Sequence, residues 1–155
     1  MTIKKYHGDR KKYLPPLLEA DPCEEMLDRY LGNGFFLTAQ ADGDTAGVAC
    51  IVPVENVHNG VGGWELKNIS VAPRFQRQGV GSALIAAAEG CLPKGTPFWV
   101  GTADGSVAAL AFYRRNGFEI SHVVKGFFTD NYPEPIYDQG ILCQDMVYLY
   151  KTIGE

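Results

Sequence analysis

The chain of 155 residues lacks the cysteine and histidine patterns that mark metal and redox proteins. Its four cysteines include no close pair, so neither a zinc site of the CxxC type nor a thioredoxin-like redox motif is expected. The three histidines, His7, His58 and His122, are far apart in sequence. We therefore expect no metal ion, and we expect buried, reduced cysteines in a cytoplasmic protein.

The sequence also lacks an excess of basic residues and any long apolar run. Its 14 Lys and Arg residues stand against 18 Asp and Glu residues, and the net charge of −4 leaves no basic stripe for a nucleic acid. No apolar window reaches the length of a membrane span, and the first residues, Met1-Thr-Ile-Lys-Lys-Tyr, hold no apolar signal segment. Neither a nucleic acid nor a membrane is an expected partner.

What the sequence does contain is ordinary for a globular protein. Apolar residues make up 46% and charged residues 21% of the chain. No internal repeat, low-complexity tract or linker interrupts it. The length then predicts a single domain over residues 1–155, large enough to bury a core.

Apolar periodicity predicts the elements of the first half. Leucines and other apolar residues recur at three-to-four spacing over residues 11–34, with a second helix beginning near Asp21-Pro22 and stopped by Gly32-Asn33-Gly34. Strands are predicted over residues 35–40 and 45–54, on either side of the hairpin turn Asp42-Gly43-Asp44. A further turn over residues 60–63 leads to a strand over residues 64–71.

The second half alternates between strand and helix patterns. A helix follows the glycine-rich stretch near residue 80, a strand covers residues 98–102, and a second helix covers residues 107–115 before Asn116-Gly117. Two last strands are predicted over residues 118–128 and 145–152, with a polar, proline-bearing and aromatic loop over residues 129–140 between them. This order predicts an α/β protein with a mixed sheet, parallel only around the middle helix.

The glycine-rich stretch is the most informative part of the chain. It reads Gln76-Arg77-Gln78-Gly79-Val80-Gly81-Ser82 and lies between a strand and the start of a helix. Backbone N–H groups at a helix start have no intrahelical partner and bind phosphate. The dinucleotide fingerprint GxGxxG does not fit, because its third glycine position holds Leu84, and no Gly-Lys-Ser/Thr run forms a P-loop.

Two segments carry a family resemblance. The strand, the Ala72-Pro73 pair and the motif Gln76-x-x-Gly79-x-Gly81 resemble the signature of the GCN5-related N-acetyltransferases, the GNAT superfamily. Residues 108–118, in which a helical tyrosine precedes Gly-Phe and a strand, are similar to a second segment of that family. The resemblance covers nearly the whole chain and is vaguest over residues 2–59. It implies the GNAT fold, a central, mostly antiparallel sheet with a splayed parallel strand pair, flanked by helices.

The resemblance implies acetyl-CoA as co-substrate. Its pantetheine arm would pair with the strand backbone of Ile69, Ser70 and Val71. The loop amides would hold the pyrophosphate, and the residues concerned are Gln76, Arg77, Gln78, Gly79, Val80, Gly81 and Ser82. The alternatives are that Arg77 is a solvated loop charge, that Gly79 only permits a turn, and that Gly81 only permits close helix packing. Ser106 stands where many members of the family have an asparagine that contacts the cofactor.

The same resemblance assigns two catalytic roles. Tyr113 matches the family tyrosine that protonates the departing CoA thiolate, although it could instead only pack on the core. Glu65 matches a glutamate that serves as base in some members, directly or through water. Solvent or a partly neutral amine could replace that base, and a glutamate at the edge of a strand can be only a surface charge.

Aromatic residues near the end of the chain are expected to form the acceptor pocket. The candidates are Phe127, Phe128, Tyr132 and Tyr137, near the carboxylates Asp130, Glu134 and Asp138. Aromatic walls with carboxylates suit a cationic amine, whereas the alternative is a loop that packs its aromatic residues on the core.

The resulting prediction is an enzyme that transfers acetyl from acetyl-CoA to a primary amine of a small molecule. Attack would be direct, within a ternary complex, since no cysteine lies in either cofactor segment. Two alternatives are a protein acetyltransferase acting on lysines or N-termini, and a non-catalytic module that binds acyl-CoA as a sensor. In this family the final strands also offer an edge for a homodimer.

Overall fold

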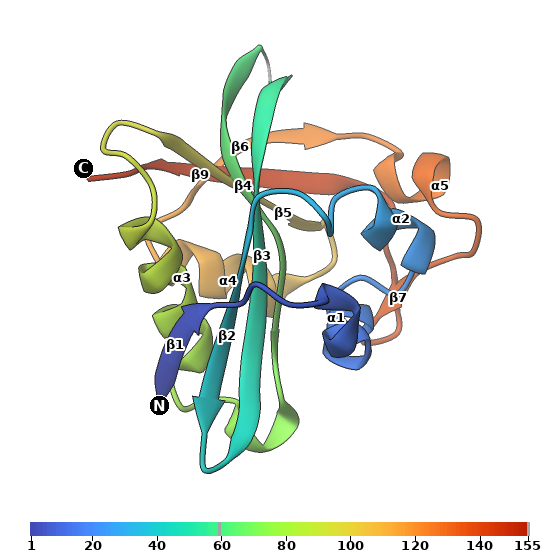
Figure 1. Ribbon diagram of the computed structural model, residues 1–155. Coiled ribbons are helices and arrows are strands. Elements are labelled where there is room, and N and C mark those ends of the chain that lie inside the picture. The colour runs from blue at the N-terminus through green and yellow to red at the C-terminus, as the bar shows by residue number, and fades with distance from the viewer. Residues whose placement is uncertain (59, 155) are drawn as a thin grey trace.

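The computed structural model describes residues 1–58 and 60–154 and builds them around one seven-stranded sheet (Figure 1). The strands are β1 (Thr2–Lys5), β2 (Phe35–Ala41), β3 (Asp44–His58), β4 (Val61–Val71), β5 (Pro97–Ala103), β6 (Glu119–Val124) and β9 (Met146–Thr152). Their order is β1-β2-β3-β4-β5-β9-β6, and within the described ranges only β4 and β5 pair in parallel. The predicted mostly antiparallel sheet with one parallel pair is confirmed.

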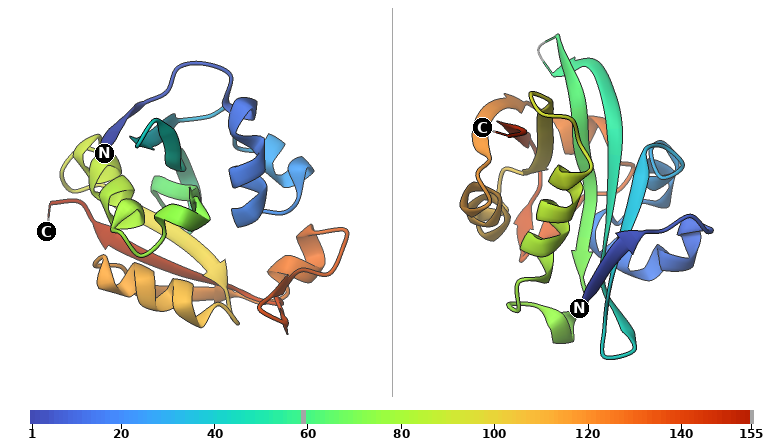
Figure 2. Two further views of the ribbon diagram at one scale, coloured as in Figure 1. Left: turned by 90° about the horizontal axis from the view of Figure 1, so that it is seen from below. Right: turned by 60° about the vertical axis from the view of Figure 1, so that its left-hand side comes forward.

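Helices cover both faces of this sheet, and the alternation of side chains along β3 shows why. Val48, Cys50 and Val52 point to one face, where they pack with residues of α1 (Leu14–Ala20) and α2 (Glu24–Asp28). Ala49 and Ile51 point to the other face, where they share a core with α3 (Val80–Gly90) and α4 (Val107–Arg115). Figure 2 shows α3 and α1 on opposite sides of the sheet.

The parallel pair separates soon after it forms. In register, only residues 64–66 of β4 pair with residues 98–100 of β5 among the described residues. A bulge follows at once, because Cys50 pairs with Asn68 whereas Ile51 pairs with Leu66, so Lys67 is an extra residue in β4. The second half of β4 therefore faces an opening on its β5 side, as a splayed pair requires.

The prediction of a strand over residues 118–128 is wrong in its second half. Strand β6 ends at Val124, and Gly126 adopts a left-handed conformation with φ 68° that ends the extended backbone. Asp145 holds this corner by accepting hydrogen bonds from the Gly126 N–H at 2.9 Å and from Lys125 Nζ at 3.1 Å. Phe127 and Phe128 consequently lie in the short helix α5 (Phe127–Asn131).

Several other boundaries differ from the predictions. The predicted loop over residues 129–140 contains the end of α5 and strand β7 (Tyr137–Asp138), which pairs with β8 (Ile141–Leu142). Residues 61–63, predicted as a turn, already belong to β4, and β1 was not predicted. The N-terminal helical region consists of three short pieces, because a 3₁₀ helix (Arg10–Tyr13) precedes α1 and α2. A second 3₁₀ helix (Pro73–Phe75) follows β4. No helix within the described residues is both long enough and apolar enough to cross a membrane.

Candidate active site

A cleft of about 870 Å³ lies at the opening between β4 and β5. Its wall includes Asp21 and Tyr30 from the face of α1 and α2, and Ala109 and Tyr113 from α4 on the opposite face. A cleft lined from both faces of a sheet lets two ligands approach from different sides and meet in the middle. Seven of the predicted site residues line it, namely Glu65, Ser106, Tyr113, Phe127, Phe128, Tyr132 and Tyr137.

The predicted cofactor residues on β4 and in the glycine loop do not line this cleft. Ile69, Ser70 and Val71 form the last part of β4, beyond the bulge, and pair with residues 47–49 of β3 on one side only. Their remaining backbone groups face the side from which β5 has diverged. An extended chain of amides fits such an unpaired strand side.

The glycine loop presents a row of free backbone donors. The N–H groups of residues 77–82 have no hydrogen-bond acceptor within the described part of the chain. Gly79 has φ 83° and Arg77 has φ 63°, so the backbone turns sharply just before α3 begins. The side chain of Gln76 donates to the Val71 carbonyl at 3.0 Å, and that of Gln78 donates to the Arg74 carbonyl at 3.0 Å. Both glutamine side chains therefore hold the loop to the preceding strand and 3₁₀ helix.

The two glycines of the motif have different surroundings. A Cβ atom at Gly79 would meet nothing within 4 Å, so its left-handed φ is what favours glycine there. A Cβ atom at Gly81 would lie 2.9 Å from Cζ of Phe112 on α4. The missing side chain of Gly81 therefore permits close packing of α3 on α4. This packing does not compete with ligand binding, because the N–H groups of residues 77–82 have no acceptor in the described part of the chain.

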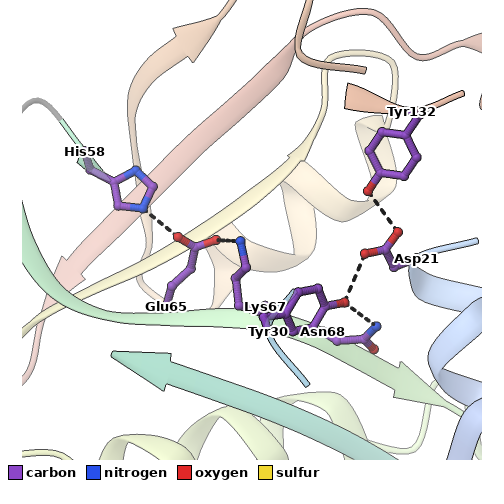
Figure 3. Close-up of polar contacts among 7 residues, drawn as sticks. All are labelled: Asp21, Tyr30, His58, Glu65, Lys67, Asn68 and Tyr132. Atoms are coloured by element: carbon purple, nitrogen blue, oxygen red, sulfur yellow. Dashed lines mark hydrogen bonds and ion pairs between the residues drawn. The ribbon is translucent and has the colours of Figure 1, made fainter. Parts of the chain in front are cut away.

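Glu65 is buried rather than at the surface, with 4% of the residue exposed. It lies on β4 in the interior of the sheet, so the surface-charge alternative for this residue is wrong. Its Oε1 accepts a hydrogen bond from His58 Nε2 at 2.6 Å, and its Oε2 lies 3.3 Å from Lys67 Nζ (Figure 3). Burial by itself would raise the pKa of Glu65, but the hydrogen bond from His58 and the charge of Lys67 outweigh burial and lower the pKa.

Tyr113 lies on α4 with its ring packed edge-on against Phe112 and Phe118, at centroid distances of 5.4 and 5.9 Å. Burial raises the pKa of its phenol to about 12. The side chain therefore packs on the core and lines the cleft at the same time, and its hydroxyl keeps its proton at neutral pH.

Ser106 immediately precedes α4 but makes no side-chain capping bond to that helix. Its hydroxyl instead donates to a carboxylate oxygen of Asp138 on β7. Of the three carboxylates predicted near the acceptor, Asp138 lines the cleft, while Asp130 and Glu134 do not. This bond ties the start of α4 to the C-terminal wall of the cleft.

Asp21, which sequence reasoning missed as a site residue, is the centre of a polar network on the opposite wall. Its carboxylate accepts hydrogen bonds from Tyr30 at 3.0 Å and from Tyr132 at 2.8 Å (Figure 3). The Asn68 amide in turn donates to the Tyr30 oxygen at 3.2 Å and to the Leu17 carbonyl at 3.1 Å. Burial and the charge of Asp21 raise the pKa of both tyrosines, which therefore remain donors.

The aromatic residues predicted for the acceptor pocket pack on one another as well as on the cleft. Phe127 and Phe128 meet edge-on at a centroid distance of 5.3 Å, and Tyr132 lies 5.4 Å from Phe128. Tyr137 is exposed on β7. Phe127, Phe128 and Tyr132 thus pack together as one wall of the cleft, and this packing places the Tyr132 hydroxyl next to Asp21.

No group of three or more His, Cys, Asp or Glu side chains in residues 1–58 and 60–154 is arranged to hold a metal ion.

Comparison with known proteins identifies the family. A sequence model described as "Acetyltransferase (GNAT) domain" matches residues 32–120, more than half of the chain. The chain belongs to the GNAT family of acetyltransferases. The uncharacterized N-acetyltransferase YvbK of Bacillus subtilis (strain 168) is 35% identical over 139 residues, which are 88% of this chain and 86% of that protein.

Solved structures of GNAT proteins match over nearly the full length. A GNAT family acetyltransferase from Elizabethkingia anophelis, crystallised with acetyl-CoA bound, superimposes with a TM-score of 0.83 at 35% identity and covers 97% of both chains. A Bacillus subtilis acetyltransferase in complex with CoA gives a TM-score of 0.81 at 30% identity, again over 97% of both chains. A ribosomal-protein-S18-alanine N-acetyltransferase from Escherichia coli matches at 22% identity with a TM-score of 0.69, which is a likeness of fold alone. The chain is thus an acetyl-CoA-dependent N-acetyltransferase that acts on an acceptor.

Proposed function

We propose that this GNAT enzyme acetylates a primary amine of a small, cationic molecule by direct attack within a ternary complex. The observation that carries the proposal is Asp21, a carboxylate in the wall of the cleft whose hydrogen-bond partners are two neutral phenols. Neither phenol neutralises its charge, and no cation pairs with Asp21 within the described residues. An acceptor that carries an ammonium group would supply that charge.

The wall around Asp21 favours a small acceptor over a long peptide. The Tyr132–Asp21 hydrogen bond joins segments 111 residues apart and crosses from the C-terminal wall to the α1–α2 connection. A groove open enough for a long peptide would need the Tyr132–Asp21 hydrogen bond to be absent or broken. The aromatic rings beside it offer faces for a cation–π contact.

For the co-substrate, we assign pantetheine to the backbone of Ile69, Ser70 and Val71, and the pyrophosphate to the amides of residues 77–82. Free N–H donors at the start of α3 and an unpaired strand side support this assignment. Arg77, exposed and without an ion-pair partner among the described side chains, would add a charge-assisted contact. Ser106 remains a proposed contact, because a hydroxyl that donates to Asp138 can still accept from a pantetheine N–H.

The reaction then uses two side chains of the cleft. Glu65 accepts the proton of the acceptor ammonium, directly or through a water molecule, and the neutral amine attacks the thioester carbonyl. The tetrahedral intermediate collapses, the C–S bond breaks, and Tyr113 donates its phenolic proton to the departing thiolate. The extra proton on the attacking nitrogen passes to the Tyr113 phenolate, directly or through water, so that the amide product is neutral and the phenol is restored. Since only a neutral amine can attack, activity should rise from mildly acidic to mildly alkaline pH.

The test is a screen of small amines and of peptides, followed by Asp21→Asn. In the variant, the KM for the small amine should rise by about tenfold or more, because a charge-assisted hydrogen bond is worth roughly 1.5–3 kcal/mol. The KM for acetyl-CoA should stay the same. Asp130→Asn is the matched control, since it makes the same change at a carboxylate of α5 that does not line the cleft.

Other outcomes would point elsewhere. A clear preference for peptides, or an unchanged KM in Asp21→Asn, would contradict the small cationic acceptor and favour a protein acetyltransferase. Binding of acetyl-CoA without turnover on either panel would favour a sensor module. The cytoplasmic location, the single domain over residues 1–155 and a homodimer through the final strands stay predictions.

A further inference from the structure

A buried histidine stands beside Glu65 on the side that does not line the cleft. His58 is the last residue of β3, and 3% of it is exposed. Its Nε2–H donates to Glu65 Oε1 at 2.6 Å, while Oε2 of the same carboxylate lies toward Lys67 (Figure 3). Glu65 lines the cleft and His58 does not. The histidine therefore reaches the cleft through its neighbours, by a hydrogen bond to Glu65 and by ring packing on Tyr148, which also lines the cleft.

Aromatic rings fix the orientation of this imidazole. It stacks on Trp99 of β5 with a centroid distance of 4.5 Å and an interplanar angle of 27°. Tyr148 of β9 packs on it at 4.5 Å and 58°. A ring held by two larger rings cannot turn freely, so the direction of its Nε2–H is set by the sheet.

The other ring nitrogen has no hydrogen-bond partner. His58 Nδ1 is one of only two buried side-chain nitrogen or oxygen atoms without a partner among the residues that the structure describes. Leaving a buried polar atom unpaired costs about 1–3 kcal/mol. An apolar residue at this position would avoid that cost, so the bond to Glu65 must compensate for it or serve the reaction.

The charged and titratable groups around His58 and Glu65 come from three strands. Lys67 on β4 contacts Oε2. Tyr148 on β9 remains protonated, since burial and the charge of Glu65 raise its pKa. His122 on β6 has its ring 5.7 Å from that of His58, and burial and the charge of His58 lower its pKa. Lys67 and His58 are thus the groups that stabilise the negative charge of Glu65, from opposite sides.

We propose that His58 is the positioning residue for the base of the reaction: it turns Glu65 so that Oε2 faces the acceptor cleft, and it stabilises the charge of that carboxylate. This inference rests on the proposed role of Glu65. The proton of the acceptor ammonium passes to Oε2, and the hydrogen bond between Nε2–H and Oε1 persists throughout. After turnover the proton leaves Oε2 to solvent through the cleft.

The first test compares His58→Gln with His122→Gln. Glutamine at 58 removes the imidazole and its fixed direction, so kcat should fall by about tenfold or more, a part of the roughly 10²–10⁴-fold that a general base supplies. The KM for acetyl-CoA should not change. A glutamine amide can donate to Glu65 only without the fixed direction of the imidazole, so the hydrogen bond to Oε1 should weaken. Burial of Glu65 is then less opposed, so its pKa should rise and the acidic limb of the kcat/KM profile should move to higher pH. His122→Gln, which changes the same aromatic cluster without touching Glu65, should leave kcat and this limb in place.

A second readout does not depend on turnover. With ¹³C-labelled glutamate, the carboxyl resonance of Glu65, assigned by its absence in Glu65→Gln, should titrate at a higher pH in His58→Gln than in the wild type. His58→Phe, which keeps a ring between Trp99 and Tyr148 but offers no donor, should shift it further. If this variant fails to fold, the glutamine variant carries the test.

The two hypotheses fail in different ways. If Glu65→Gln retains full activity, Glu65 is not the base and the proposed mechanism is wrong, whatever His58 does. If Glu65→Gln loses activity while His58→Gln keeps the wild-type kcat, acidic limb and Glu65 resonance titration, only the role of His58 is overturned.

Discussion

At the scale of single residues, the surroundings of Tyr113 restrict what this side chain can do. Its phenol is buried among apolar rings, and burial alone raises its pKa to about 12. A group with that pKa is protonated throughout the physiological range, so it can give a proton to a leaving thiolate but cannot serve as a base. The side chain also packs on Phe118. The two roles expected from the sequence, a proton donor in the site and a residue of the core, are therefore compatible at this position.

Tyr113→Phe should therefore lower kcat by about 10²–10⁴-fold while acetyl-CoA binds as before. Phenylalanine keeps the ring between Phe112 and Phe118 and removes only the hydroxyl, so the core should not loosen. Steady-state kinetics together with calorimetric titration of acetyl-CoA would measure the two effects separately. Tyr137→Phe is the control, since its exposed ring lines the same cleft but is assigned no proton. Unchanged kcat in Tyr113→Phe would exclude Tyr113 as the acid.

A site residue could be predicted from the sequence where it lies at a fixed distance along the chain from a recognisable motif. Glu65 and Tyr113 lie at fixed distances from a loop and a helix end, so the motif located them. Asp21 meets Tyr132 across 111 residues, and His58 of β3 meets Glu65 of the neighbouring strand β4 in a register that no motif describes. Contacts of this kind follow from how the strands and helices are arranged, which periodicity does not specify.

At the scale of elements, Gly81 is where α3 touches α4. The absent side chain lets the end of the Phe112 ring lie where a Cβ atom would otherwise crowd it at 2.9 Å. The same glycine belongs to the row of free amides in front of α3. Helix contact and loop position are therefore coupled, so that moving α3 away from α4 would also move the donors.

Gly81→Val should lower the free energy of unfolding by about 1–3 kcal/mol through overpacking, and it should weaken acetyl-CoA binding. Gly90→Ala is the matched control at the other end of α3, because a Cβ atom there would meet nothing within 4 Å. That variant should keep wild-type binding and match or exceed wild-type stability. Urea unfolding would measure the free energy of unfolding, and calorimetry would measure the affinity for acetyl-CoA. If the two variants had equal stability and equal affinity, the helix contact and the loop position would not be coupled.

Element prediction failed where a single backbone conformation overrides the apolar pattern. The sequence over residues 118–128 is apolar and β-branched enough for one long strand, but the left-handed Gly126 and its bonds to Asp145 end it and start α5. Strand β1 was missed because a four-residue strand carries too little alternation to be recognised. The strands and helices around the glycine loop were predicted well, since turn residues bound them on both sides.

At the scale of the whole molecule, the chain divides into two halves that meet along a short seam. Strands β1 to β4 come from the first half and β5, β9 and β6 from the second. Among the residues that the structure describes, β4 and β5 pair over residues 64–66 and 98–100 only. The cleft opens along the rest of that seam. A co-substrate in this opening, with its pyrophosphate at the start of α3, would contact both halves and link them.

Acetyl-CoA should consequently stabilise the entire fold and not just the loop. At a concentration one hundred times its Kd, the co-substrate should add about 2.7 kcal/mol to the free energy of unfolding. For a domain of this size that amounts to a rise in Tm of about 5–11 °C. NAD, which has a pyrophosphate but no pantetheine to fill the seam, should raise Tm far less. Gly81→Val should lose most of the shift and Gly90→Ala should keep it, as followed by calorimetry. A shift of equal size with NAD would mean that the phosphate loop alone provides the binding energy, and that the two halves are held together without help from the ligand.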